Sequence, residues 1–290
     1  MQPDELAGWL RLVLTPGVGN QAARRLLAEF GLPQAVFEQS GHALGRCVGT
    51  AQATSLKAMP ATLAPLLERT LAWLQAADGS GDAPRAILTL GDAGYPAALL
   101  AIEDPPLMLY LMGRGLDAAP SPPPSQHSVA IVGSRNPTPQ GAANAKAFAR
   151  AFVEAGLPVV SGLAMGIDGA AHQGALDGAA AASGRLATVA VVGTGLDRVY
   201  PARHRALAHR IKAQGLIVSE FALGTPPLNQ NFPRRNRIIS GMSRGVLVIE
   251  ADVRSGALIT ARRAVDDQSR PVFALPGRVD NPLSAGPHQL

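Results

Sequence analysis

The sequence predicts an α/β fold in which a doubly wound, mainly parallel sheet follows a small all-α domain at the N-terminus. Two observations carry this prediction. From Ser128 onward, short runs of β-branched and aliphatic residues alternate with helical segments, and most connections are long enough for a parallel crossover. Before residue 77 the chain shows amphipathic helical patterns instead. The predicted domains are residues 1–80, which are helical, and residues 84–290, which hold the sheet.

The first domain is predicted to consist of short helices around a Gly-Val-Gly turn. The expected helices are Leu6–Leu14, Gln21–Phe30, Ala35–Gln39 and Leu63–Ala76. The turn between the first two can present backbone N–H groups to a nucleic-acid phosphate. The match is short, so a turn that only joins two packed helices is the favoured interpretation. Residues 77–84 have the composition of a linker.

Eight strands are expected in the second domain. Residues 85–90 and 107–112 come first, with a helix at 96–102 between them, and the Ala-, Ser- and Pro-rich residues 117–126 are expected to form a surface loop of the same domain. The remaining strands are predicted at Val129–Val132, Leu157–Val160, Thr188–Val192, Leu216–Val218, Val246–Ile249 and Val272–Ala274.

Composition restricts the class of protein. The 290 residues are 47% apolar and 16% charged, which is enough apolar material for a sizeable core. The formal net charge of +5 favours a polyanionic partner. Cys47 is the single cysteine, so neither an intramolecular disulfide nor a cysteine-based metal site is expected. The absence of a signal-peptide pattern and of an apolar run of about 20 residues predicts a cytoplasmic protein without membrane association.

The central motif is Val-Ala-Ile-Val-Gly-Ser-Arg at residues 129–135. A buried strand runs into a glycine, and a helix is expected from Gln140 to Ala155. A strand, glycine turn and helix start direct free N–H groups at an anion, and Arg135 adds a fixed positive charge there. The alternative is an ordinary turn with a surface arginine.

Glycines and small hydroxyl side chains follow the other strands as well. Because the carboxyl ends of parallel strands meet at one edge of a sheet, these turns predict a shared phosphate site. The predicted residues of these turns are Gly133, Ser134, Arg135, Ser161, Gly162, Gly166, Gly193, Thr194, Gly195, Ser255, Gly256 and Thr260. A dinucleotide site is disfavoured because the first turn lacks Gly-x-Gly-x-x-Gly, and no ATP-type phosphate loop occurs.

A basic stretch at residues 229–244 completes the predicted site. No acidic residue occurs between Glu220 and Glu250. An aromatic residue and arginines at a helix start are typical of single-stranded nucleic-acid binding, in which rings stack on bases and arginines hold the backbone. The alternative is a core position for Phe232 and an ion pair of Arg237 with Glu220 or Glu250. The predicted contacts are Asn229, Phe232, Arg234, Arg235, Asn236 and Arg237.

Catalytic and metal sites are not predicted. Asp168 and His172 share a helix face, but no third metal ligand has a suitable spacing. Asp168 is expected to cap the helix that follows it, and Glu250 is expected to be structural. His204 and His209 are expected at the surface. No nucleophile elbow occurs.

Together these motifs resemble the DNA-processing protein A (DprA/Smf) family of bacterial transformation. The resemblance covers about Ser128 to the C-terminus. It is carried by the stretches 129–135, 161–168 with His172, 193–201, 232–241, 250–251, 254–260 and 273–277. The Pro-Gly-Val-Gly turn is similar to the family's sterile-alpha-motif-like or helix-hairpin-helix-like domain. Where this chain has Asn229, some relatives carry a lysine.

The resemblance implies an extended Rossmann-like domain that binds single-stranded DNA, forms a homodimer, protects incoming DNA and helps load the RecA recombinase. It implies no catalysis and no cofactor. It further implies that Arg135 and Phe232 lie in the basic pocket that holds the DNA, and that relatives continue beyond the position of Leu290, near their dimer and recombinase surfaces.

Two other functions are weighed against this one. A phosphoribohydrolase of the lysine-decarboxylase-like group shares a Gly-Ser-Arg turn on a similar sheet. Its Pro-Gly-Gly-x-Gly-Thr-x-x-Glu motif is absent here, and Arg-Ser-Gly-Ala-Leu-Ile-Thr at residues 254–260 takes its place. A purely structural scaffold leaves the arginines and the aromatic residue of 229–244 unexplained.

Overall fold

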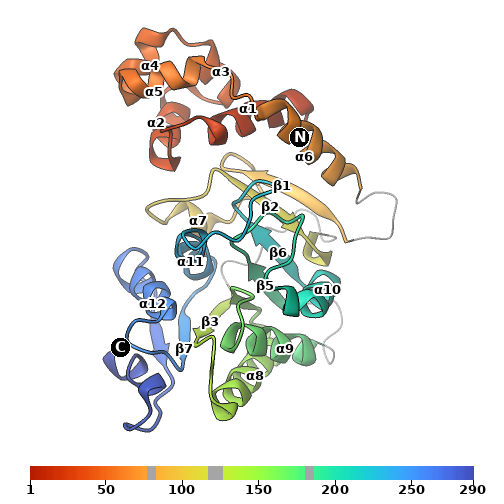
Figure 1. The fold of residues 1–290 in the computed structure, drawn as a ribbon, viewed down its shortest axis with the longest axis vertical. Coiled ribbons are helices and arrows are strands. Elements are labelled where there is room, and N and C mark those ends of the chain that lie inside the picture. The colour runs from red at the N-terminus through yellow and green to blue at the C-terminus, as the bar shows by residue number, and fades with distance from the viewer. Residues whose placement is uncertain (77–82, 117–126, 180–185) are drawn as a thin grey trace. The chain divides into compact units, whose positions relative to one another are not determined.

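The computed structural model describes residues 1–76, 83–116, 127–179 and 186–290 (Figure 1). The predicted loop at 117–126 and residues 77–82 of the predicted linker lie outside these ranges. The contacts divide the chain into two compact units. One unit comprises Met1–Asp82 with Asp104–Met108, and the other comprises Ala83–Glu103 with Leu109–Leu290.

The first unit is helical. Its helices are α1 (Pro3–Leu14), α2 (Asn20–Phe30), α3 (Pro33–Glu38), α4 (Gly41–Val48), α5 (Thr50–Lys57) and α6 (Leu63–Gln75). Leucines of several helices, such as Leu10, Leu26 and Leu56, are fully buried, and Trp9 is buried as well. The sequence analysis missed α4 and α5, which are only eight residues long and are separated by Gly49 at φ +94°. Helices of two turns leave too short a periodic pattern to detect.

The second unit contains one eight-stranded sheet. Its strands are β1 (Arg85–Thr89), β2 (Met108–Met112), β3 (Val129–Gly133), β4 (Val159–Ser161), β5 (Thr188–Val191), β6 (Leu216–Ser219), β7 (Val246–Ile249) and β8 (Val272–Ala274). They lie in the order β1-β2-β6-β5-β4-β3-β7-β8. The pairs from β6 through β8 are parallel, and β2 pairs with β6 antiparallel. The predicted fold class is therefore confirmed.

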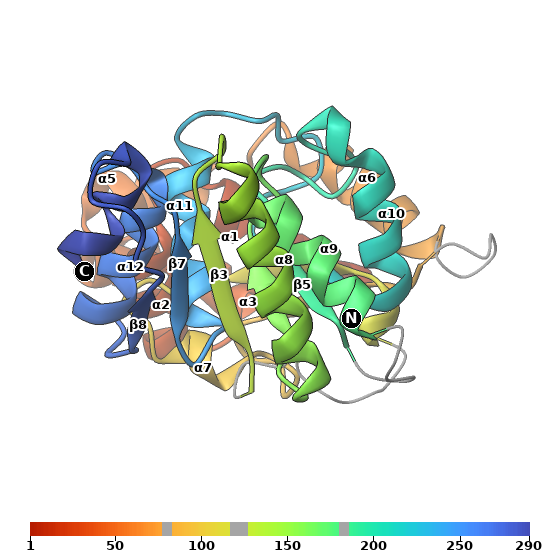
Figure 2. The same cartoon turned by 90° about the horizontal axis from the view of Figure 1, so that it is seen from below.

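Helices cover both faces of the sheet. Figures 1 and 2 show α8 (Pro139–Glu154), α9 (Ile167–Ala179) and α10 (Arg205–Gln214) on one face. The short helix α7 (Ala97–Leu100) and the helices α11 (Asn231–Gly241) and α12 (Gly256–Asp266) lie on the other face. Four 3₁₀ helices complete the described elements: Arg114–Leu116, Ala202–His204, Pro282–Ser284 and Pro287–Gln289.

Strand β4 begins two residues later than expected, at Val159. The reason is local. Gly156 takes φ +84° after α8, and the Leu157 N–H donates to the Phe152 carbonyl at 2.8 Å. These residues close the end of the helix before the chain can enter the sheet.

The sheet reverses its winding between β3 and β7. From β3 the chain moves to β4, β5 and β6 in one direction, and from β7 it moves to β8 in the other. The two strands pair from Ala130–Val246 to Gly133–Ile249, so both end at the same level. Ligands of open α/β sheets bind where the strand order reverses, outside the carboxyl ends. The topology therefore directs attention to the turns that follow β3 and β7.

Within the described ranges, no helix combines the length and the apolar character that crossing a bilayer requires.

Candidate nucleic-acid interface

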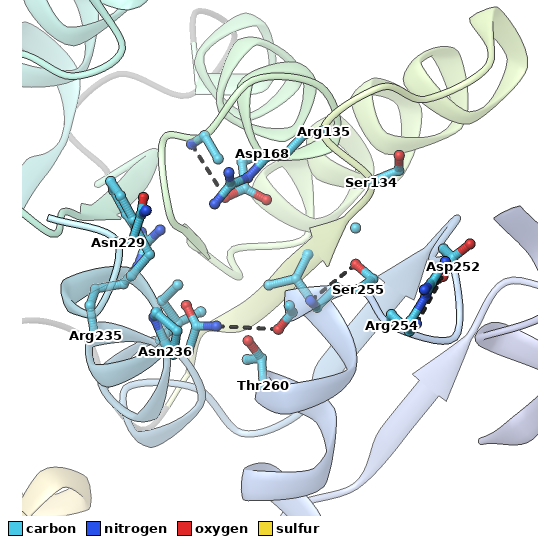
Figure 3. Close-up of a pocket in the computed structure, with 18 residues that line it drawn as sticks. Ser134, Arg135, Asp168, Asn229, Arg235, Asn236, Asp252, Arg254, Ser255 and Thr260 are labelled. Carbon is cyan, nitrogen blue, oxygen red and sulfur yellow. Dashed lines mark hydrogen bonds and ion pairs between the residues drawn. The ribbon is translucent and has the colours of Figure 1, made fainter. Parts of the chain in front are cut away.

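A cavity of about 480 Å³ lies at the carboxyl ends of β3 and β7. Figure 3 shows its walls, which come from the turn after β3, the start of α9, the helix α11, and the loop and first turns of α12. The predicted site residues among its lining are Gly133, Ser134, Arg135, Asn229, Phe232, Arg235, Asn236, Ser255, Gly256 and Thr260. Two charged residues of the lining, Asp252 and Arg254, were not among the predicted site residues. They lie in the loop between β7 and α12, which contains neither a glycine turn nor a basic cluster that would have singled them out.

The turn after β3 is held rigidly. The Ser134 N–H donates to the Glu250 carbonyl at 2.6 Å, and the Ser134 carbonyl accepts from the Ile167 N–H at 3.0 Å. A side chain at Gly133 would collide with the Ile249 carbonyl and with Ile167. Glycine is therefore required at this close approach of strand and helix. The turn leaves Arg135 exposed at the cavity.

Glu250 anchors the beginning of α8. Its carboxylate accepts from the Thr138 N–H at 2.7 Å and from the Thr138 hydroxyl at 2.5 Å. The same Thr138 hydroxyl oxygen accepts from the Gly141 N–H and so caps α8. Glu250 itself takes φ +49°, which is uncommon for a residue other than glycine. Both carboxylate oxygens of Glu250 are thus occupied by hydrogen bonds within the fold.

Asp168 does not cap the helix that follows it, and that expectation is wrong. It lies in the first turn of α9, and its carboxylate accepts from Gly162 N–H at 3.1 Å and Ala164 N–H at 3.4 Å in the preceding loop. The loop folds back over the helix start because Gly166 takes φ +79°. Burial raises the pKa of the Asp168 carboxyl, and the nearby Arg235 opposes this change.

Arg235 is buried, with 4% of its surface exposed. Its Nη1 donates to the Gly162 carbonyl at 2.6 Å and to the Val191 carbonyl, which tie α11 to the ends of β4 and β5. Burial lowers the pKa of this guanidinium to about 10, so it remains charged at neutral pH beside Asp168. Its side chain supports the fold in addition to lining the cavity.

Arg237 forms an ion pair with Glu220, as the alternative interpretation expected. Two N–O distances are 2.6 Å, and the side chains of Arg237 and Glu220 are 3% and 4% exposed. Arg234 lies 3.6 Å from the same carboxylate and is 54% exposed. Neither arginine lines the cavity of about 480 Å³. The predicted DNA contact of Arg237 is therefore wrong, because its charge is already neutralised inside the protein.

Phe232 forms part of the cavity wall and is half-buried. Its ring centroid lies 5.5 Å from that of Tyr200 and 5.6 Å from the Arg135 guanidinium carbon. A side chain at Gly193 would come within 3.0 Å of the ring. Tyr200 was not among the predicted site residues. Its signal was available, since it follows the strand-end turn at 193–195 by only a few residues.

The start of α12 faces the cavity. The Ser255 hydroxyl oxygen accepts from the Ala257 N–H at 3.2 Å and caps the helix. Asn236 donates to the Gly256 carbonyl at 3.3 Å and joins α11 to α12, as Figure 3 shows. Thr260 is buried in the same wall. A helix N-terminus and an exposed guanidinium at one cavity favour an anionic ligand.

Several residues that were predicted to bind phosphate make hydrogen bonds or close contacts within the fold instead. The buried Ser161 hydroxyl donates to the Ile131 carbonyl at 2.7 Å. A side chain at Gly166 would collide with the Ser134 carbonyl, and one at Gly195 would approach Asp197 and Ala222. Gly162, Gly193 and Thr194 line a second, smaller cavity. The sheet edge thus gathers these residues, but only part of them faces the larger cavity.

The histidines of the second unit have different surroundings. His172 is fully buried, with Nδ1 2.8 Å from the Thr188 hydroxyl, and burial lowers its pKa to about 3. His204 is half-buried and donates from Nδ1 to the Leu163 carbonyl at 3.0 Å, whereas His209 is exposed. The described ranges contain no cluster of three or more His, Cys, Asp or Glu residues suited to a metal ion.

Comparison with known proteins identifies relatives that match most of this chain. The chain is 45% identical over 226 residues to protein Smf of Escherichia coli, which covers 77% of this chain and 55% of that protein. It is 39% identical over 280 residues to protein Smf of Synechocystis, which covers 97% of this chain and 67% of that protein. The DNA processing protein DprA of Streptococcus pneumoniae is 44% identical over 199 residues, which cover 69% of this chain and 66% of that protein. The chain thus spans between about half and two thirds of these relatives.

Solved structures agree with this comparison. The X-ray structure of DprA from Streptococcus pneumoniae superposes with a TM-score of 0.76 at 32% identity, and covers 100% of this chain and 92% of that one. A DprA structure from Helicobacter pylori, described for its single-stranded DNA binding mode, gives a TM-score of 0.59 at 30% identity and covers 70% and 86% of the two chains. The family model for DNA recombination-mediator protein A matches residues 86–290. The chain belongs to this DNA-processing family, the DprA/Smf family.

Proposed function

We propose that this protein binds single-stranded DNA at the cavity of about 480 Å³ without catalysing a reaction on it. One observation carries the proposal. An exposed arginine, Arg135, and a half-buried aromatic ring, Phe232, share one wall at the carboxyl ends of β3 and β7. The guanidinium can hold a phosphate while the ring offers a surface for a base.

The finer function rests on the family. The matched family is named for recombination mediation, and the relative from Helicobacter pylori is described as binding single-stranded DNA. On this basis the protein acts in natural transformation and recombination, where it protects incoming single strands and helps load the RecA recombinase. It does so in the cytoplasm as a homodimer, with no cofactor and no membrane partner.

Binding to strands of equal length tests the proposal. Fluorescence anisotropy with a labelled oligonucleotide, single-stranded and then annealed, should show tighter binding of the single strand at every salt concentration. The logarithm of the association constant should fall linearly with the logarithm of salt, because phosphate contacts release counterions. Equal affinity for both forms would contradict the proposal. So would release of a free base from a nucleoside monophosphate, which would indicate a phosphoribohydrolase.

A further inference from the structure

The position of Arg135 depends on the loop that carries it. This loop, residues 134–138, joins β3 to α8. Among the described residues the Arg135 guanidinium has no hydrogen-bond or ion-pair partner, and its carbon lies 5.6 Å from the centroid of the Phe232 ring. No bond of the side chain itself therefore holds this charge at the cavity, and the loop backbone has to do so.

Glu250, the first residue after β7, holds both ends of that loop. At the first end, its carbonyl accepts from the Ser134 N–H at 2.6 Å. At the other end, its carboxylate accepts from the N–H of Thr138 at 2.7 Å and from the hydroxyl of Thr138 at 2.5 Å. Pro137, inside the loop, has a fixed φ and so further limits the conformations of the loop. One residue of the neighbouring strand end thus fixes where the loop begins and where it ends.

The backbone of Glu250 indicates that its carboxylate is required. Glu250 takes φ +49°, a conformation that glycine adopts more easily. The first turn of α8 also leaves room for the carboxylate, because a Cβ at Gly141 would come within 2.3 Å of the Glu250 carboxyl carbon. A glycine at position 250 would satisfy the turn alone, so the side chain needs a separate reason.

We propose that Glu250 is a positioning residue for DNA binding, which holds the loop 134–138 so that Arg135 is already placed at the cavity when the strand arrives. Glu250 does not line that cavity and acts through the loop. A loop ordered in advance lowers the entropy that binding has to remove. This inference rests on the proposed function, and it adds a residue outside the binding surface on which the affinity depends.

Glu250→Gly tests the proposal, because glycine accepts the backbone conformation and removes the carboxylate. Loss of a negative charge near a site for a polyanion would by itself strengthen binding. The positioning role predicts the opposite sign. Folded Glu250→Gly should bind a labelled single strand about 2- to 10-fold more weakly in fluorescence anisotropy, which is the scale of ordering one side chain on binding.

A double-mutant cycle shows whether Glu250 acts through Arg135. The loss caused by Glu250→Gly should vanish when Arg135→Ala is already present, because no guanidinium is left to position. All four proteins are titrated at low ionic strength, which strengthens every remaining phosphate contact. Hydrogen exchange adds a measurement without DNA: the Thr138 amide, which donates to the carboxylate, should exchange faster in Glu250→Gly.

Variants of the bonded partner make the result specific. Thr138→Val removes the hydroxyl and should also weaken binding, whereas Thr138→Ser restores the hydroxyl and should recover the affinity. Thr138 also caps α8, so Ser40→Ala is the matched control. It removes a cap of the same kind from α4 and should leave DNA binding unchanged.

Equal or tighter binding by folded Glu250→Gly would overturn the positioning role, and so would an equal loss with and without Arg135. If Glu250→Gly does not fold, unchanged binding by Thr138→Val would overturn it instead. Failure of the proposed function is distinguishable, because the wild type itself would then not bind the single strand.

Discussion

Arginine side chains have opposite surroundings in two regions of this protein. The cavity rim, defined here as Arg135, Phe232 and Arg254, is accessible to a ligand, and Arg254 is 93% exposed. The buried ionic group, defined as Asp168, Glu220, Arg235 and Arg237, has its charges paired with one another or with backbone N–H and carbonyl groups.

The comparison shows that a basic stretch is not equivalent to a basic surface. Helix α11 contributes the most concentrated arginines in the sequence, yet Arg235 and Arg237 are directed inward and support the ends of the strands. Arg135 stands apart from that cluster in the sequence and remains exposed at the cavity. We therefore expect the rim to contribute to ligand binding and the buried ionic group to contribute to stability. Each of the following predictions tests this division.

Loss of Arg237 should have the largest effect. Arg237→Ala leaves the Glu220 carboxylate buried beside one partly exposed arginine, and breaking a buried pair typically costs about 3–5 kcal/mol. Urea unfolding should show this decrease in the free energy of unfolding. Arg254→Ala, at the rim, is the matched control and should change stability little. Equal stability of the two variants would contradict the division.

Arg135→Ala should weaken single-stranded DNA binding by about 1–3 kcal/mol, the scale of a charge-assisted hydrogen bond. Its Tm should stay close to that of the wild type because the side chain is exposed. The salt slope should become shallower by about 0.7 for each phosphate contact removed. A marked drop in Tm, or unchanged binding, would place Arg135 with the buried group.

Phe232→Ala separates stacking from charge at the rim. Loss of a stacked base should weaken binding by about 1–3 kcal/mol and leave the salt slope unchanged, because no phosphate contact is removed. Titrations at several salt concentrations measure both quantities. If the ring serves only the core, the variant should instead unfold more easily by about 3–5 kcal/mol, and its folded fraction should bind normally.

The smallest expected effect is a pH dependence of stability, which arises from the buried residue His172. The pKa of His172 is lowered from 6.5 to about 3 by burial, so the unfolded chain binds a proton that the folded protein rejects. The folded state is favoured by the neutral form of His172. This contribution to the free energy of unfolding is present above pH 6.5 and is lost as the pH falls toward 3. From about pH 7.5 to about pH 5.5 the free energy of unfolding should drop by about 1.4 kcal/mol. His172→Gln should remove this dependence, and an unchanged slope would contradict it.

The sequence predicted much of the fold and part of the site. Runs such as Val129–Val132 and Val246–Ile249 are apolar throughout because both faces of a parallel sheet are covered, and this pattern is legible without coordinates. The strand-end residues Gly133, Ser134 and Arg135 followed from the same pattern. Short helices such as α4 were missed, since eight residues carry little periodicity.

By itself, then, the sequence indicated where the strands lie along the chain, the doubly wound class and the sheet edge at which a ligand site is expected. These followed because hydrophobic periodicity and turn residues are local properties of the chain. Only the tertiary structure decided which arginine reaches a ligand. The hydrogen-bond partners of Arg235 and Arg237 are Gly162, Val191 and Glu220, which lie in or directly after β4, β5 and β6 and are 17 to 73 residues away in the sequence. Burial of a charge depends on such distant partners, and no local pattern of residues can specify them.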